Sequence, residues 1–141
     1  NNIFPVITQV AAGNLGKLTI FGNDWPTSDG TGVRDYIHVM DLAEGHIATL
    51  EYLNNYENKI VNLNLGTGLG TSVLKLIDTF EKVNNVKISK NFSSRRVGDS
   101  GTVIADNCLA LSCLNWSPKR NLEEMCLDGW KWQSINSHGY Q

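Results

Sequence analysis

Residues 21–43 read FGNDWPTSDGTGVRDYIHVMDLA, and this stretch combines a turn-rich loop, a short apolar run and the start of a helix. From Gly22 to Gly32 the chain is rich in glycine, aspartate and threonine, which are residue types typical of loops. The run Tyr36–Val39 predicts a short strand, and Asp41 is a residue type that caps a following helix. The stretch therefore predicts a loop, a short strand and the start of a helix in direct succession.

The segments on either side continue this alternation of helices and short strands. Besides the strand at 36–39, apolar runs predict strands at Leu18–Phe21, Ile60–Leu65, Val86–Phe92 and Thr102–Ala105. Helical spacing or capping residues predict helices from Phe4 to Ala11 and after Asp41, Thr71 or Ser72, Asp106 and Asn121. In the helix after Asp41, the residues expected to face inward are Ala43, Ile47, Leu50 and Leu53. We therefore predict one domain, residues 1–141, of the mixed α/β class with a small sheet.

The composition is that of an ordinary soluble protein, with 41% apolar and 18% charged residues. Twelve Lys and Arg against fourteen Asp and Glu give a net charge of −2, which argues against duplex DNA or an anionic membrane as a partner. No run approaches the ~20 apolar residues of a membrane span. The three cysteines form no Cys-x-x-Cys pair and fit reduced thiols. We therefore expect a cytoplasmic protein that binds neither nucleic acid nor membrane.

The glycine run Gly66–Gly70 lies between a predicted strand and a predicted helix, where a dinucleotide-binding loop would lie. That loop needs its third glycine three residues after the second, whereas here it follows after two. The sequence therefore predicts a tight turn into a capped helix. No tyrosine has a lysine four positions later, and the three histidines lack metal-ligand partners, so His38 and His46 are expected to be hydrogen-bonded structural residues. We predict no catalytic, cofactor-binding or metal-binding residue in this chain.

Five side chains are suited to an anionic nucleotide. Arg34 and the pair Arg95-Arg96 are cations that can fork onto phosphate oxygens, and Asp99, three residues after Arg96, can accept from two ribose hydroxyls. Phe21, at a strand end beside the loop, can present its ring to a base. The alternatives are a solvated arginine pair, an Arg34–Asp35 or Arg96–Asp99 salt bridge, and a phenylalanine that belongs to the core.

Over its whole length the sequence resembles the UDP-glucose 4-epimerase (UDP-galactose 4-epimerase) family of extended short-chain dehydrogenases. The resemblance rests on residues 21–43, on Asn64–Gly68 before Ser72 and Val73, on Arg95-Arg96-x-Gly98-Asp99 and on Trp130-x-Trp132-Gln133-Ser134. It covers the C-terminal, UDP-sugar-binding part of that family. The family's N-terminal Rossmann domain, with the Tyr-x-x-x-Lys pair, binds NAD. The resemblance thus implies that this chain is a fragment, inactive alone, with NAD bound outside it.

The resemblance implies roles for five residues at the nucleoside and in the pocket around it. Backbone groups of Thr19 and Phe21 read the uracil edge, and the Phe21 ring lies beside the base. Asp99 holds the uridine ribose, while Tyr36 and Val73 line the pocket. These residues would fix the nucleoside firmly while the sugar turns over.

At the diphosphate and sugar end, the resemblance implies a second set. Asn2 hydrogen-bonds the diphosphate, and Ile3 stands where an apolar residue of the family meets the nucleotide. Arg34 and Arg96 clamp the phosphates. Val103 stands where the family often has a tyrosine beside the sugar's 2-substituent. Since valine is smaller, we expect tolerance of UDP-GlcNAc and UDP-GalNAc besides UDP-glucose and UDP-galactose.

For the complete protein, the resemblance implies a homodimeric isomerase. It would interconvert UDP-galactose and UDP-glucose through a 4-keto intermediate formed with NAD. Two alternatives stay open: another nucleotide-sugar epimerase or dehydratase of the same superfamily, and a non-catalytic nucleotide-sugar-binding module. If the chain is a fragment, apolar surface that faced the Rossmann domain should be exposed.

Overall fold

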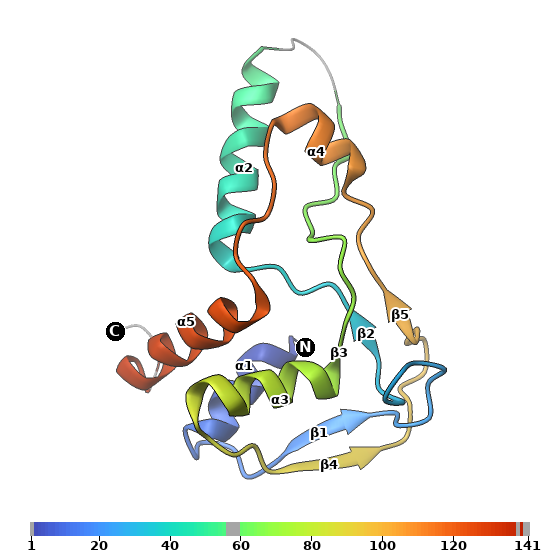
Figure 1. Ribbon diagram of the computed structural model, residues 1–141, viewed down its shortest axis with the longest axis vertical. Coiled ribbons are helices and arrows are strands. Elements are labelled where there is room, and N and C mark those ends of the chain that lie inside the picture. The colour runs from blue at the N-terminus through green and yellow to red at the C-terminus, as the bar shows by residue number, and fades with distance from the viewer. Residues whose placement is uncertain (1, 56–59, 138, 140–141) are drawn as a thin grey trace.

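The computed structural model describes residues 2–55, 60–137 and 139, and Figure 1 shows a body from which an arm extends. We define the body as residues 2–36, 71–103 and 121–135, and the arm as residues 37–55, 60–70 and 104–120. Together they confirm the predicted mixed α/β class, with five helices and two small sheets in the described part of the chain.

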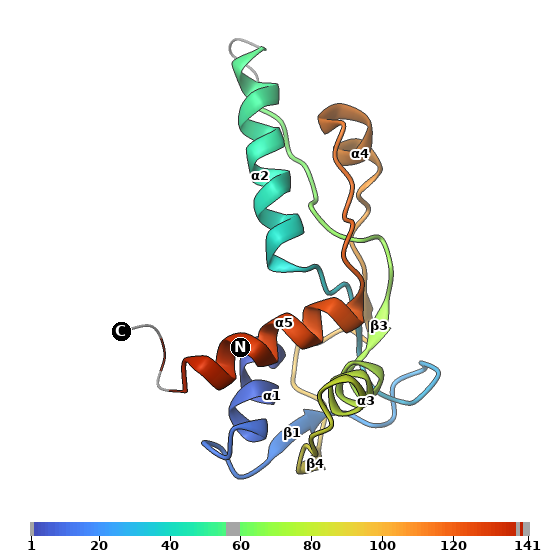
Figure 2. The ribbon, with the colours of Figure 1, turned by 60° about the vertical axis from the view of Figure 1, so that its left-hand side comes forward.

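The body is built on a parallel two-stranded sheet, β1 (Leu18–Phe21) and β4 (Lys90–Ser93), in which Leu18 pairs with Lys90 and Phe21 with Ser93. Helices α1 (Ile3–Ala11), α3 (Val73–Asn84) and α5 (Leu122–Ile135) lie above this sheet in Figures 1 and 2. The buried side chains of the body's core are Ile7, Val10, Leu18, Ile20, Leu76, Ile77, Phe80, Ile88 and Cys126. At its centre, the Phe80 ring meets the rings of Phe4 and Trp130 edge to face, with centroids 6.0 and 6.1 Å away.

A second sheet, of three very short strands, lies where the chain passes between the body and the arm. Its central strand, β2 (Val33–Arg34), pairs antiparallel with β3 (Thr71–Ser72) and parallel with β5 (Thr102–Val103). In the register, Arg34 lies opposite Thr71 on one side and Val103 on the other. This sheet fixes the positions of β2, of the start of α3 and of the segment that follows β4.

The arm consists of α2 (Val39–Asn54), the extended segment 60–70 and α4 (Cys108–Leu114). Figures 1 and 2 show α2 rising away from the body, with α4 beside its upper part. Among its described residues, the buried apolar side chains are Ala110, Leu114 and Trp116. The arm is therefore much less enclosed than the body.

Two predictions for the region between the loop and α2 are wrong. The strand is Val33–Arg34 rather than Tyr36–Val39, and α2 already begins at Val39. The reason is that His38, in extended conformation, caps the helix: its Nδ1 accepts a hydrogen bond from the Met40 N–H at 3.1 Å. Asp41 consequently lies in the first helical turn instead of at the cap.

The inward face predicted for α2 is also wrong. Its expected core residues Ala43, Ile47, Leu50 and Leu53 are exposed, Ile47 at 57% and Leu50 at 64%. The helix instead turns Gly45 inward, where a Cβ would lie 3.1 Å from Leu65 and 3.2 Å from the Trp116 ring. A Cβ at this position would be in tight contact with both side chains, so the small residue lets Leu65 and Trp116 pack close to the helix, while the larger apolar residues of α2 lie outside.

The predicted strand Ile60–Leu65 is not a strand. The segment is extended, but it has no hydrogen-bonded strand beside it among the described residues, and Ile60 is 95% exposed. An alternating sequence makes a strand only when a neighbour supplies the backbone partners. Here Leu63 and Leu65 instead pack, half-buried, beside the core of the arm.

The predicted capping signals mostly hold. Ser72 caps α3 by accepting from the Lys75 N–H, and Asn121 with Glu124 forms the predicted capping box of α5. At α4 the cap position is Asn107, although the Asp106 carboxylate accepts from the Cys108 N–H. Strands β4 and β5 are shorter than predicted, and α5 continues into the tail as far as Ile135. Residues 138 and 140–141 of that tail lie outside the described residues.

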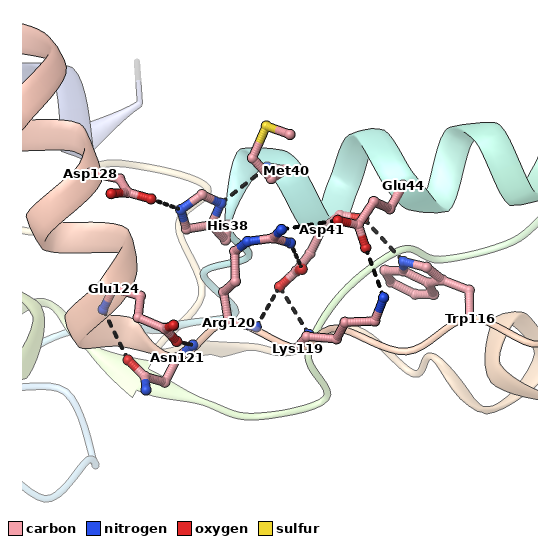
Figure 3. Close-up of polar contacts among 10 residues, drawn as sticks. All are labelled: His38, Met40, Asp41, Glu44, Trp116, Lys119, Arg120, Asn121, Glu124 and Asp128. Atoms are coloured by element: carbon pink, nitrogen blue, oxygen red, sulfur yellow. Dashed lines mark hydrogen bonds and ion pairs between the residues drawn. The ribbon is translucent and has the colours of Figure 1, made fainter.

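Within the arm, a buried carboxylate of α2 holds the segment that leads to α5, as Figure 3 shows. Asp41 is fully buried and accepts hydrogen bonds from the backbone N–H groups of Lys119 and Arg120, at 3.1 and 2.9 Å, and from the Arg120 guanidinium. Arg120 also pairs with Glu44 at 3.0 Å. Burial raises the pKa of Asp41, but these hydrogen bonds and the Arg120 charge outweigh it and hold that pKa below its usual range.

His38 links the arm to the body. Its ring is buried, and Nε2 lies 3.2 Å from the Asp128 carboxylate on α5 while Nδ1 caps α2. Nδ1 of His46 lies 2.7 Å from the carbonyl oxygen of Leu42. Both confirm the prediction of hydrogen-bonded structural histidines. Within the described ranges, no helix is both long enough and apolar enough to cross a membrane.

Candidate functional site

An open cleft of about 530 Å³ lies in the body between the start of α1, strand β1, the loop after β1, strand β2 and the segment after β4. Of the ten predicted site residues, those that line it are Asn2, Ile3, Thr19, Phe21, Arg34, Tyr36, Val73, Arg96 and Asp99. They come from segments that are far apart in the sequence. The fold thus brings together residues that the resemblance named one by one.

Two predicted arginines line the cleft, and Lys17 adds a third cation to its wall. Arg96 donates from Nε to the Asp99 carboxylate at 3.0 Å, and its guanidinium carbon lies 4.8 Å from the centre of the Phe21 ring. Arg34 donates to the carbonyl of Val33 at 2.8 Å, and its guanidinium covers Gly32. The Arg96–Asp99 salt bridge considered from the sequence is therefore present, and it uses only one edge of the Arg96 fork.

The tyrosine of the cleft carries an unused hydrogen-bonding group. The hydroxyl of Tyr36 is buried and has no hydrogen-bond partner in the described part of the chain. Burial raises the pKa of Tyr36 to about 12, against a smaller opposite effect of the Arg34 charge, so the hydroxyl keeps its proton at neutral pH. A buried polar group without a partner costs roughly 1–3 kcal/mol, which a ligand that accepts its hydrogen bond would recover.

The N-terminus of α1 borders the same cleft. Asn2 caps this helix, with Oδ1 accepting from the Phe4 N–H at 3.1 Å, which leaves the Asn2 amide NH₂ for another partner. Ile3 and Val6 follow along the wall. A helix N-terminus favours a negative charge in front of it, so this side of the cleft adds to the effect of the two arginines.

The loop between β1 and β2 is fixed to α3 by one carboxylate. Asp29 accepts from the N–H of Thr31 at 2.9 Å and from the hydroxyl of Ser72, the residue that caps α3. Burial raises the pKa of Asp29, but the hydrogen bonds from Ser72 and Thr31 outweigh it, so that pKa lies below its usual range. The loop is therefore a fixed wall of the cleft.

The tenth predicted residue, Val103, does not line the cleft. It lies on β5, opposite Arg34 in the register, and is 53% exposed. Sequence reasoning in turn missed several residues of the cleft wall: Val6, Lys17, Leu18, Ile20, Trp25 and Gly32. The alternation along β1 could have indicated some of these, whereas Trp25 gave no signal beyond an aromatic residue in a turn-rich loop.

Backbone N–H groups of the glycine run, residues 66–70, already have a hydrogen-bond partner within the chain. The Asp35 carboxylate accepts from the N–H groups of Thr67 and Gly68 at 3.0 and 2.9 Å, and from the Thr67 hydroxyl at 2.5 Å. These are the amides that a cofactor phosphate would need, so residues 66–70 do not fit a dinucleotide. Asp35 is also not the partner of Arg34 that the alternative interpretation required. No group of His, Cys, Asp and Glu side chains among the described residues is arranged to hold a metal ion.

Comparison with known proteins gives a consistent result. The family described as GDP-mannose 4,6 dehydratase matches residues 1–128. The chain is 52% identical over 141 residues to UDP-glucose 4-epimerase from Bacillus subtilis (strain 168) and 48% identical over 141 residues to that from Drosophila melanogaster. These matches cover 100% and 99% of this chain but 41% and 40% of the relatives. The chain therefore spans about two fifths of the length of the relatives it matches.

Solved structures agree with the sequence relatives. A UDP-glucose 4-epimerase from Bifidobacterium longum, in complex with NAD⁺ and UDP, matches 99% of this chain and 41% of its own, with a TM-score of 0.92 and 38% identity. One from Stenotrophomonas maltophila, with bound NAD and formylated UDP-arabinopyranose, matches 96% of this chain and 40% of its own, with a TM-score of 0.90 and 47% identity.

Proposed function

The chain belongs to the family described as GDP-mannose 4,6 dehydratase, and we propose that it forms the UDP-sugar-binding part of a UDP-glucose 4-epimerase. The observation that carries this proposal is the convergence of the predicted ligand residues on one cleft. The names of the relatives point to the same activity, and two similar structures hold a UDP moiety. In this proposal the chain corresponds to the C-terminal part of an enzyme that interconverts UDP-galactose and UDP-glucose.

The chain's own residues would act by holding the nucleotide. Arg34 and Arg96 neutralise the diphosphate, the Asn2 amide and the Tyr36 hydroxyl donate to oxygens of the ligand, and the edge of β1 faces the base. Asp99 is held beside Arg96 and can accept from the ribose. Binding energy is thus concentrated on the UDP moiety, which leaves the sugar free to turn over.

NAD is proposed as the cofactor of the complete enzyme, held by a part of the protein outside this chain. The glycine run 66–70 does not fit it, because Asp35 already takes the amides of Thr67 and Gly68. On the same grounds, the chain alone should bind UDP without catalysing turnover. A homodimer and a cytoplasmic location complete the proposal.

We also propose that the enzyme accepts N-acetylated sugars. Val103 pairs with Arg34, one of the proposed diphosphate ligands, so a sugar that extends beyond the diphosphate along β5 would reach it. A valine leaves more room there than a tyrosine. The measurement is the ratio of turnover of UDP-GalNAc to that of UDP-galactose in wild type and Val103→Tyr. A ratio that falls in the variant supports the proposal, and an unchanged ratio contradicts it.

The main test is UDP binding by calorimetry to the protein expressed from its full natural reading frame. Arg96→Ala removes charge-assisted hydrogen bonds worth roughly 1.5–3 kcal/mol, so Kd should rise about ten- to a hundredfold. Lys131→Ala, which removes an exposed cation from α5, is the matched control and should leave Kd unchanged. Unchanged UDP affinity in Arg96→Ala, or absence of UDP binding in the wild type, contradicts the proposed function.

A further inference from the structure

The adjacent arginines Arg95 and Arg96 point to different partners. Arg96 lines the cleft, whereas Arg95 turns to the loop after β1. The Nε of Arg95 donates to the Asp24 carboxylate at 2.7 Å, and a terminal nitrogen of the same guanidinium donates to the Asp24 carbonyl. The guanidinium carbon also lies 4.0 Å from the centre of the Trp25 ring. Arg95 therefore contacts both the backbone and the side chain of this loop.

The indole of Trp25, which is partly buried, also packs closely against two glycines. A Cβ at Gly22 would lie 2.5 Å from the indole Nε1, and one at Gly101 would lie 2.9 Å from Cε3. The backbone of Trp25 is fixed as well, since its N–H donates to the carbonyl of Gly30 at 2.9 Å. An aromatic side chain packed against two glycines and a guanidinium has little freedom, and this one forms part of the cleft wall.

We propose that Arg95 is a positioning residue that holds Trp25 in place as a wall of the nucleotide cleft, and that the ligand meets Trp25 and Arg96 but not Arg95. This inference rests on the proposed function. Without Arg95, Trp25 would have to be ordered when the nucleotide binds. Ordering one large side chain weakens binding by about two- to tenfold.

The competing interpretation makes Arg95 a second cation for the diphosphate. The geometry is against it, because one edge of the guanidinium is committed to Asp24 and one face to Trp25. The two interpretations differ in their dependence on salt. Loss of a charge that acts on a ligand lowers the salt dependence of binding, whereas loss of a charge already paired with Asp24 does not. They also differ for lysine, which keeps the charge but lacks the planar fork.

The experiment measures UDP affinity at two salt concentrations, together with acrylamide quenching of Trp25 fluorescence, in the protein expressed from its full natural reading frame. The Trp25 signal is the difference between each protein and its Trp25→Phe version. In Arg95→Ala we expect Kd to rise about two- to tenfold with unchanged salt dependence, and quenching of Trp25 to increase. Arg95→Lys should behave like Arg95→Ala. Asp24→Asn, which weakens the clamp from its other side, should change Kd and quenching in the same direction.

Arg96→Ala serves as the matched comparison, with a larger rise in Kd, a weaker salt dependence and unchanged quenching. Reduced salt dependence in Arg95→Ala, or full rescue by Arg95→Lys, would overturn the positioning role. So would unchanged Kd and quenching in both Arg95→Ala and Asp24→Asn. If the wild type does not bind UDP, the proposed function fails, and this inference fails with it. If the wild type binds UDP but the Arg95 variants give one of the contradicting results, only this inference fails.

Discussion

The body and the arm differ in how completely each encloses its apolar residues. The body buries a continuous cluster between its sheet and three helices, with Phe80 at the centre, and it carries the cleft. The arm buries only a small cluster around Trp116, while Ile47 and Leu50 of α2 face outward. The comparison teaches that the body has the core needed to hold a ligand site. The arm, by contrast, has a small core and is held internally by the contacts of Asp41.

The exposed face of α2 also bears on the proposed function. Contiguous apolar residues on a helix indicate a surface that another part of a protein covers. The relatives are more than twice as long as this chain, and exposed apolar surface is what the resemblance predicts for a separated substrate domain. The exposed apolar face of α2 is consistent with that expectation.

The largest expected effect is a loss of stability in the body. Phe80 is fully buried between Phe4 and Trp130, so Phe80→Ala should lower the free energy of unfolding by about 3–5 kcal/mol and weaken UDP binding. Denaturant unfolding followed by circular dichroism measures the loss. Leu50→Ala on the exposed face of α2 is the control and should change stability by no more than about 0.5 kcal/mol. Similar losses in both variants would contradict the distinction between the two parts.

The next effect loosens the arm while leaving the cleft intact. Asp41→Asn removes the charge that accepts from Arg120 and should cost about 2–3 kcal/mol. Amide hydrogen exchange along α2 should accelerate, while UDP affinity stays unchanged because Asp41 is not part of the cleft. Asp78→Asn, at an exposed position on α3, is the matched control. Weaker UDP binding in Asp41→Asn would show that arm and cleft are coupled.

The same carboxylate gives the arm a pH dependence. Because the folded state holds the pKa of Asp41 below its unfolded value, the stabilisation is present above pH ~4 and is lost as the pH falls through the folded pKa. The stability difference between wild type and Asp41→Asn should therefore shrink on acidification below pH ~4. The comparison cancels the contribution of Asp29, whose pKa is also lowered. A constant difference down to pH 2 would be inconsistent with this assignment.

The smallest effect concerns the cap of α2. His38→Ala removes the acceptor for the Met40 N–H and should cost about 1 kcal/mol. Asparagine is a good capping residue, so His38→Asn should recover most of this loss even though the contact with Asp128 changes. Denaturant midpoints of the two variants measure the difference. Equal losses would mean that the Asp128 contact, and not the cap, carries the role of His38.

The sequence predicted the body better than the arm for a physical reason. Caps such as Ser72 and the Asn121–Glu124 box depend on local hydrogen bonds, so they were predicted correctly. In the arm, the face of α2 is chosen by the contact of Gly45 with Trp116, two residues far apart in the sequence. Residues 60–65 depend on a neighbouring strand that the described residues do not supply.

The site was predicted through resemblance more than through spacing. Spacing alone indicated only Arg34, Arg95, Arg96, Asp99 and Phe21, each with an ordinary alternative. The Arg96–Asp99 pair shows that one such alternative is present together with the cleft. Trp25 was missed because the Arg95 side chain that it contacts comes some seventy residues later in the chain. Asp35 was missed because its partners lie in the glycine run.

Chemical-shift mapping of UDP binding on the isotope-labelled 141-residue chain tests the central claim most directly. We predict perturbations at the cleft, on β1, around Arg34 and Tyr36, and at Arg96 and Asp99, with the amides of α2 and α4 unaffected. That result would place the ligand on the body alone. Absence of any perturbation, or perturbations concentrated in the arm, would contradict the assignment of the cleft as a UDP site.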